Sequence, residues 1–126
     1  MRERHILVVD DNPTNLKLAC DVLEFSGYRV SSAMDADQAL MLIRQSQPEL
    51  ILMDIGLPGM DGLTLTRKLK GQEKTRDIRI VALTAFAMKG DEERVIEAGC
   101  DGYIAKPIDT RALPRQVAEC LGEEAS

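Results

Sequence analysis

The sequence predicts an α/β fold, with one doubly wound, five-stranded parallel sheet in a single domain over residues 1–126. Short apolar runs alternate with amphipathic segments, and at least three of the runs are nearly continuous in apolar residues. Strands that helices cover on both faces have this composition. Strands that alternate with helices are joined by right-handed crossovers, which produce a parallel sheet between two helical layers. A chain of 126 residues is long enough to bury one hydrophobic core.

The apolar runs are the predicted strands. Each is four or five residues long and is bounded by polar or turn-forming residues, as a buried strand should be. They are HILVV (His5–Val9), YRVSS (Tyr28–Ser32), ELILM (Glu49–Met53), RIVAL (Arg79–Leu83) and GYIA (Gly102–Ala105).

The segments between the strands are predicted helices. Three of them place apolar residues at the spacing of a helix that is buried on one side, which is i, i+3, i+4 and i+7 in the first two and i, i+4, i+7 and i+8 in the last. Two others, at about Gly62–Lys70 and Met88–Ala98, are less clearly periodic. The three stripes are Leu16, Ala19, Cys20 and Leu23, then Ala36, Ala39, Leu40 and Ile43, and finally Leu113, Val117, Cys120 and Leu121.

Several residues mark where the helices should begin and end. Asn12 is a suitable N-cap, and Pro13 after it suits the first helical position because its missing N–H would have no helical partner there. Gly27, Gly71 and Gly99 stand where three of the helices should stop.

Composition argues against several classes of function. The formal net charge is −5, and two Tyr, two Phe and no Trp leave little for base stacking, so we expect no nucleic-acid partner. No signal peptide precedes the first strand and no apolar run has the length of a membrane span, which predicts a cytoplasmic protein without a membrane partner. The three cysteines show no C-x-x-C spacing and are predicted to be small buried thiols.

Polar residues follow four of the predicted strands. Asp10 and Asp11 follow the first strand, Asp54 the third, Thr84 the fourth and Lys106 the fifth. In parallel sheets, binding sites gather at the carboxyl ends of the strands. Carboxylate oxygens are ligands that Mg²⁺ prefers, and adjacent aspartates at an apolar strand end need a positive charge nearby. The sequence therefore predicts a magnesium site at this edge.

Each of these residues also has a simpler interpretation when it is taken alone. Asp11 and Thr84 could cap helices, Asp54 before G-L-P-G could belong to a turn, and Lys106 could be an ordinary surface charge. Their joint position at the same end of different strands favours a common site.

Four motifs in order, VVDDN, LMDIGLPGMDG, ALTA and YIAKP, resemble those of response-regulator receiver domains, the phosphoacceptor half of two-component signalling. The resemblance covers essentially the whole chain. It implies a flavodoxin-like receiver fold with strand order 2-1-3-4-5. The segment TAFAMKGDEERVIEAG also resembles stand-alone cell-cycle regulators and the receivers of hybrid histidine kinases.

The resemblance implies roles for the acidic residues. Asp54 would be the phosphoacceptor. Asp11, Asp54 and the backbone carbonyl of Gly56 would bind Mg²⁺, with Asp10 assisting through water, and Mn²⁺ would be able to substitute for Mg²⁺. No organic cofactor is implied.

The resemblance also implies roles for residues around the acceptor. Thr84 and Lys106 would contact the phosphoryl oxygens, and the Lys106–Pro107 bond would be cis. Tyr103 would be the aromatic residue of the switch. Independently of the resemblance, Phe86 is expected to shield the phosphoryl group, because its apolar ring two residues beyond Thr84 excludes water. We also expect Met88 to lie on an output face formed by the fourth helix, fifth strand and fifth helix.

These assignments predict a signalling protein and not an enzyme, with self-phosphorylation and self-dephosphorylation at most. The expected partners are a sensor histidine kinase or histidine phosphotransfer protein, and a downstream kinase or adaptor. The starting methionine and the short tail after the last helix favour a stand-alone receiver without an output domain over a receiver excised from a hybrid kinase.

Two proteins of other classes share part of this pattern. A Mg²⁺-dependent aspartyl-phosphate phosphatase of the haloacid-dehalogenase type would need D-x-D after the first strand, and Asp10, Asp11 and Asn12 do not provide it. A flavodoxin-like flavin binder would need a Ser/Thr/Gly phosphate loop there, and D-D-N-P-T-N would repel a phosphate without a metal.

Overall fold

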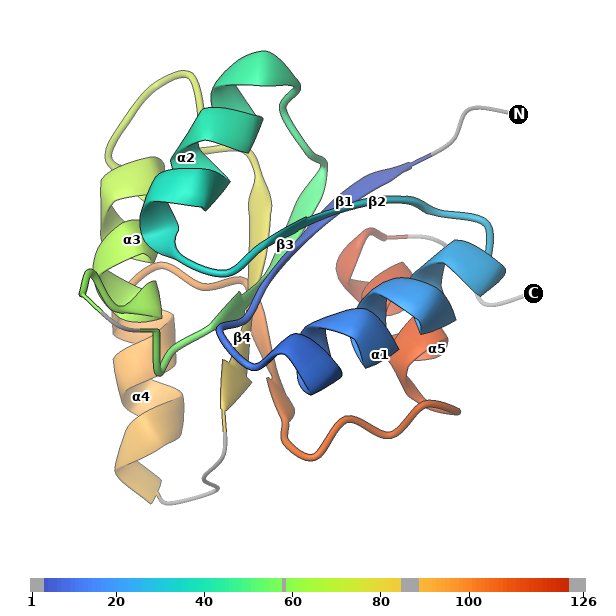
Figure 1. The fold of residues 1–126 in the computed structure, drawn as a ribbon. Helices are drawn as coiled ribbons and strands as arrows, with labels where there is room; N and C mark the ends of the chain where they lie inside the picture. Colours follow the sequence, from blue (N-terminus) through green and yellow to red (C-terminus); the bar gives the residue numbers. More distant parts are fainter. Residues whose placement is uncertain (1–3, 58, 85–88, 123–126) are drawn as a thin grey trace.

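The computed structural model describes residues 4–57, 59–84 and 89–122, and these form one five-stranded parallel sheet between two layers of helices (Figure 1). The strand order is β2-β1-β3-β4-β5, which confirms the predicted fold class and order. The elements are β1 (His5–Val9), α1 (Pro13–Phe25), β2 (Arg29–Ala33), α2 (Ala36–Gln45), β3 (Leu50–Asp54), α3 (Gly62–Lys70), β4 (Arg79–Thr84), α4 (Lys89–Glu97), β5 (Gly102–Ala105) and α5 (Leu113–Cys120).

Strands β1 and β5 have the predicted bounds, whereas β2 and β3 begin and end one residue later and β4 is one residue longer. The difference places Asp54 and Thr84 inside the sheet as the last residues of β3 and β4. Asp54 is in register with Leu83 of β4, and Thr84 with Ala105 of β5. Polarity alone would end a strand before such residues, but pairing with a neighbouring strand continues it.

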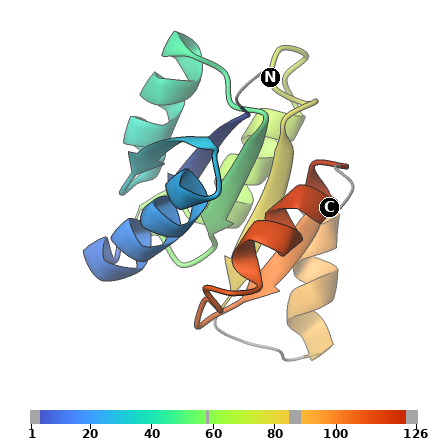
Figure 2. The same ribbon diagram turned by 90° about the vertical axis from the view of Figure 1, so that its right-hand side faces the viewer.

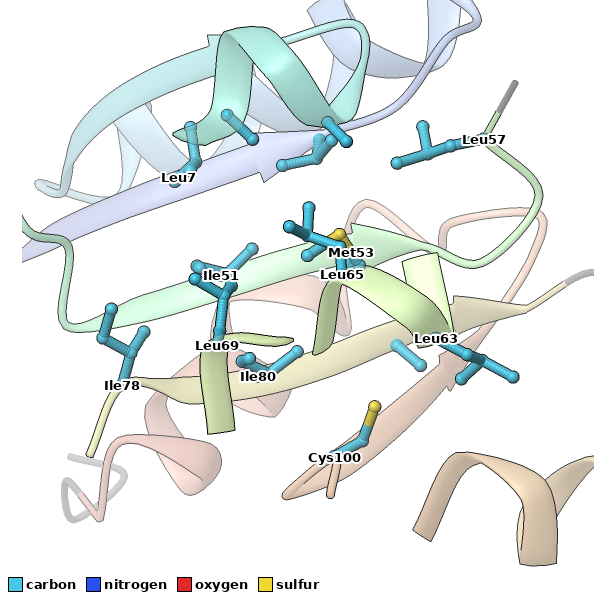
Figure 3. Close-up of a cluster of buried hydrophobic side chains, with 14 of the residues drawn as sticks. Leu7, Ile51, Met53, Leu57, Leu63, Leu65, Leu69, Ile78, Ile80 and Cys100 are labelled. Atoms are coloured by element: carbon cyan, nitrogen blue, oxygen red, sulfur yellow. The ribbon is translucent and has the colours of Figure 1, made fainter. Parts of the chain in front are cut away.

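The alternating side chains of the strands divide the core into two apolar clusters. Helices α1 and α5 cover one face of the sheet, and α2, α3 and α4 cover the other (Figures 1 and 2). In β1, Ile6 and Val8 belong to the first face while Leu7 and Val9 belong to the second. Figure 3 shows the second cluster, where side chains of α3 lie against Ile51 of β3 and Ile80 of β4.

The central strands are the most deeply buried part of the molecule. Every residue of β1 and β3 is buried, whereas the edge strands β2 and β5 are partly exposed. The cysteine prediction is correct for Cys100 only: Cys20 and Cys120 are half-buried, because each lies at the margin of its helix stripe. Burial raises the pKa of the Cys20 thiol to about 11.

The helix boundaries follow the predicted signals. The side chain of Asn12 accepts hydrogen bonds from the backbone N–H groups of Thr14 and Asn15, and Pro13 opens α1. Gly27 and Gly99 have φ values of +99° and +103°, a backbone conformation that favours glycine, and they lie just beyond α1 and α4. None of the helices in the described part of the chain is long and apolar enough to cross a membrane.

His5 is a buried strand residue, as predicted, and its Nε2 lies 2.8 Å from the Ser31 hydroxyl of β2. Burial lowers the pKa of His5 below the ordinary value of 6.5, and the Arg29 guanidinium lowers it further. The Gln47 backbone, as a hydrogen-bond acceptor, and the charge of Glu49 act in the opposite direction. The folded protein therefore favours the neutral form of the His5 imidazole.

This preference predicts a loss of stability in mild acid. Below about pH 6.5 the imidazole of the unfolded chain takes up a proton more readily than that of the folded chain, so the free energy of unfolding should fall between about pH 7 and pH 5. Urea unfolding of wild type and His5→Gln across this range measures the effect. The decrease should be smaller in His5→Gln, and equal slopes for the two proteins would contradict the assignment.

Candidate functional site

The polar residues predicted to form a site all lie at the carboxyl edge of the sheet. Asp10 and Asp11 directly follow β1, Asp54 ends β3, Thr84 ends β4, and Lys106 directly follows β5. Since β1, β3, β4 and β5 are successive parallel neighbours, these positions meet at one edge (Figure 1).

Three carboxylates form the centre of the site. One carboxylate oxygen from each of Asp10, Asp11 and Asp54 lies within 4.8 Å of the other two. Asp10 is 1% exposed and Asp54 is 5% exposed, whereas Asp11 is open to solvent. Negative charges this close repel one another, and burial of two of them reduces the screening by water.

Lys106 provides a positive charge beside two of the acids. Its Nζ lies 3.1 Å from Asp54 Oδ2 and 3.5 Å from Asp10 Oδ2, and its side chain is only 18% exposed. Burial raises the pKa of Asp10, and the nearby Asp54 raises it further, although Lys106 and the N–H of Asn12 act in the opposite direction. One ammonium group therefore does not neutralise the cluster.

Backbone hydrogen bonds orient the two buried carboxylates. Asp10 Oδ1 accepts a hydrogen bond of 2.9 Å from the N–H of Asn12, and Asp54 Oδ1 accepts one of 2.9 Å from the N–H of Gly56. The turn interpretation of Asp54 is therefore correct for one oxygen, while the other faces Lys106. Helix α1 is capped by Asn12 and not by Asp11, so the cap interpretation of Asp11 is wrong.

Thr84 and Lys106 are joined through the backbone. The N–H of Lys106 donates a hydrogen bond of 2.7 Å to the carbonyl of Thr84, and the Thr84 side chain is buried. The Lys106–Pro107 peptide bond is cis, as expected from the resemblance. The hydroxyl and the ammonium group thus come from adjacent strand ends next to Asp54.

The residues assigned to the switch lie farther from the acids or outside the described residues. Tyr103 is in β5, in register with Ala82, and is 44% exposed. Phe86 and Met88 lie outside the described residues, so their predicted roles stay predictions.

Comparison with known proteins identifies the family. A family model described as the response regulator receiver domain matches residues 6–118. The chain belongs to the response regulator receiver family. It is 44% identical over 120 residues to the polar-differentiation response regulator DivK of Brucella ovis, and this alignment covers 95% of the chain and 98% of the relative.

Solved receiver structures have the same fold. A CheY-like receiver domain protein from Methanospirillum hungatei is 32% identical with a TM-score of 0.87, covering 96% of this chain and 95% of that one. The receiver domain of a sensor histidine kinase from Pseudomonas aeruginosa is 38% identical with a TM-score of 0.86, covering 97% and 100% of the two chains. That structure holds a magnesium ion coordinated in its active-site cleft.

The acidic cluster of this receiver is compatible with a magnesium ion and with phosphorylation of an aspartate. Asp10 Oδ2 is buried and accepts no hydrogen bond from the residues that the structure describes. A buried carboxylate oxygen in that state is stabilised by a cation, and clustered carboxylates suit a hard divalent ion. The donor set therefore fits Mg²⁺.

One residue beside Asp54 was not recognised from the sequence as part of the site. Gly62 was predicted only as the start of α3, but in this receiver it lies against the backbone of Asp54 and Ile55. Its position in M-D-G was the available signal, because glycine is a poor helix former and Asp61 already caps the helix.

The exposure of Asp11 allows a clean test of metal binding. Asp11→Asn removes a carboxylate without opening the core, so the receiver should stay folded but bind Mg²⁺ more than about tenfold more weakly. A Mg²⁺ titration followed by the amide NMR signals of Gly56 and Asn12 measures this. The control is Asp37→Asn, which removes an exposed carboxylate from α2; equal midpoints in the two variants would refute the site.

Proposed function

We propose that Asp54 of this receiver accepts a phosphoryl group from a phosphohistidine on a sensor histidine kinase or a histidine phosphotransfer protein. The observation that carries the proposal is that Asp54 lies in one cluster with Asp10 and Asp11 and 3.1 Å from the ammonium group of Lys106. The relatedness to DivK and to the receiver of a histidine kinase supports it. The proposed setting is the cytoplasm.

The proposed reaction exchanges one bond to phosphorus for another. An Asp54 carboxylate oxygen forms the P–O bond as the P–N bond of the phosphohistidine breaks, and the imidazole leaves with the electron pair of that bond. The approach of a carboxylate to a charged phosphoryl group is opposed by charge repulsion. Catalysis is therefore mainly positioning and electrostatic stabilisation.

The residues of the site divide these tasks. Asp10, Asp11, Asp54 and the carbonyl of Gly56 would hold Mg²⁺, which when bound supplies positive charge to the phosphoryl oxygens; Mn²⁺ is the proposed substitute. Lys106, already 3.1 Å from Asp54, offers its ammonium group to a phosphoryl oxygen. Thr84, on the neighbouring strand, offers its hydroxyl.

Phosphorylation is expected at Asp54 alone and only with a divalent ion. Incubation with acetyl phosphate and Mg²⁺ should add one phosphoryl group, and Asp54→Asn or removal of Mg²⁺ with a chelator should abolish the addition. Intact-protein mass spectrometry measures the product. Asp101→Asn, which removes a partly exposed carboxylate directly before β5, is the control that should react like wild type. Full modification of Asp54→Asn would disprove the acceptor.

We also propose that the output of the phosphorylated receiver is a protein contact on the face of α4, β5 and α5, made with a downstream kinase or adaptor. Helix α4 packs beside β5, and this face exposes Ile96 (63%) and Tyr103 (44%). The alignment covers 98% of the DivK relative, so that relative contains little besides a receiver. Such a protein signals by changing which partners it binds.

This output face predicts a separation of phosphorylation from partner binding. Tyr103→Ala should leave Asp54 phosphorylation largely unchanged, because Tyr103 lies outside the acid cluster, but should weaken binding of the downstream partner several-fold. Met41→Ala removes an exposed side chain from α2, which packs on β2 and β1 at the opposite side of the sheet from β5, and is the control. Phosphate-dependent NMR shifts that never reach Ile96, Tyr103 or Arg111 would show that this face is not the output.

A further inference from the structure

We propose that the N-terminal half of α3 is a positioning device for the acceptor, in which Gly62 and Thr66 fix the backbone that carries Asp54. This inference rests on the proposed phosphoacceptor function. Neither residue contributes an atom to the acidic cluster. Both act through the main chain between β3 and α3.

The position of Gly62 leaves no room for a side chain. A Cβ added to it would overlap the carbonyl oxygen of Asp54 and would lie 2.8 Å from Ile55 Cα and 2.9 Å from the Asp54 carbonyl carbon. Real Cβ atoms essentially never come so close to backbone, so any side chain here forces a displacement. The φ of Gly62 is not in the positive region, so backbone conformation is not the reason for glycine.

Neither the end of β3 nor the start of α3 can move freely away from this contact. Asp54 is paired in register with Leu83 of β4, and the next N–H, that of Ile55, donates to the Leu83 carbonyl at 3.3 Å. Helix α3 is fixed to the sheet by buried leucines, among them Leu65 and Leu69, which Figure 3 shows against the strands. A displacement at Gly62 would therefore be passed to the end of β3.

Thr66 holds the same turn from within the core. Its side chain is fully buried, and its hydroxyl donates a hydrogen bond of 2.8 Å to the carbonyl of Gly62. The Sγ of the buried Cys100 lies 3.8 Å from the same hydroxyl oxygen. Asp61 caps the turn by accepting from the N–H of Thr64 at 2.8 Å. The turn is thus held on both sides of Gly62.

The backbone at the end of β3 determines where the carboxylate oxygens of Asp54 lie. Asp54 Oδ1 is oriented by the N–H of Gly56 at 2.9 Å, and Oδ2 lies 3.1 Å from Lys106. A shift of the Asp54–Ile55 backbone moves both oxygens and Gly56 relative to Asp10, which belongs to another strand. A displacement of about 1 Å at a reactive group can cost about a hundredfold in rate.

A matched pair of glycine substitutions tests the inference. Gly62→Ala should weaken Mg²⁺ binding and slow phosphorylation by acetyl phosphate, each by about tenfold or more. Gly71→Ala makes the same change at the other end of α3, where the Cβ would meet only the Arg67 carbonyl at 3.2 Å and that of Lys68 at 3.7 Å, and should leave both quantities unchanged. Both are measured well below the unfolding temperature of each variant.

A second pair decides the question if Gly62→Ala does not fold. Thr66→Val removes the hydrogen bond to Gly62, and Thr75→Val removes an equivalent bond of 2.5 Å from a buried hydroxyl to the Leu69 carbonyl, far from the acids. Both variants should lose similar stability against urea. Only Thr66→Val should shift the Mg²⁺ midpoint and the phosphorylation rate, by about threefold or more.

Each outcome has one meaning. Site effects confined to Gly62→Ala or Thr66→Val support the inference, because loss of stability alone does not change the Mg²⁺ midpoint of a folded protein. A folded Gly62→Ala with unchanged metal binding and rate would overturn it, as would equal shifts in Thr66→Val and Thr75→Val. If wild type itself neither binds Mg²⁺ nor reacts, the proposed function fails, and this result is distinct from the others.

Discussion

The mutual repulsion of three carboxylates at one edge of the sheet is the constraint around which this receiver is organised. Asp10 and Asp54 are almost completely buried, and Lys106 is the ammonium group that contacts both. Backbone N–H groups orient one oxygen of each buried acid but do not remove its charge. Such a cluster is compatible with a divalent cation and, in the proposed function, with a phosphoryl group on Asp54.

Holding these charges together requires a rigid support, and the central strands provide it. All residues of β1 and β3 are buried between the two helical layers, so the ends of these strands cannot separate without breaking the core. The strand β4 continues the support through its pairing with Asp54 and through the hydrogen bond between the Thr84 carbonyl and Lys106. The acidic cluster thus lies where the apolar core ends.

The acidic site has a different structural neighbour on each side. On one side, α3 lies directly on the backbone of Asp54, the proposed acceptor, through Gly62, which favours a fixed geometry for Asp54. On the other side, β5 connects Lys106 to the partly exposed Tyr103 and to α4. The proposed switch needs a fixed acceptor and a separate, exposed face, because its chemistry must stay constant while its contact surface changes.

The sequence by itself determined the fold class, the number and order of the elements and the polar residues at the strand ends, because apolar periodicity and cap residues such as Asn12 are local properties. Only the tertiary structure decided that β3 and β4 include Asp54 and Thr84, since strand pairing extended them. It also decided the half-buried state of Cys20 and Cys120 and the contact of Gly62 with Asp54. Strand pairing and side-chain burial depend on segments far apart in the chain, and the Gly62 contact depends on how α3 packs against the end of β3; apolar periodicity encodes neither.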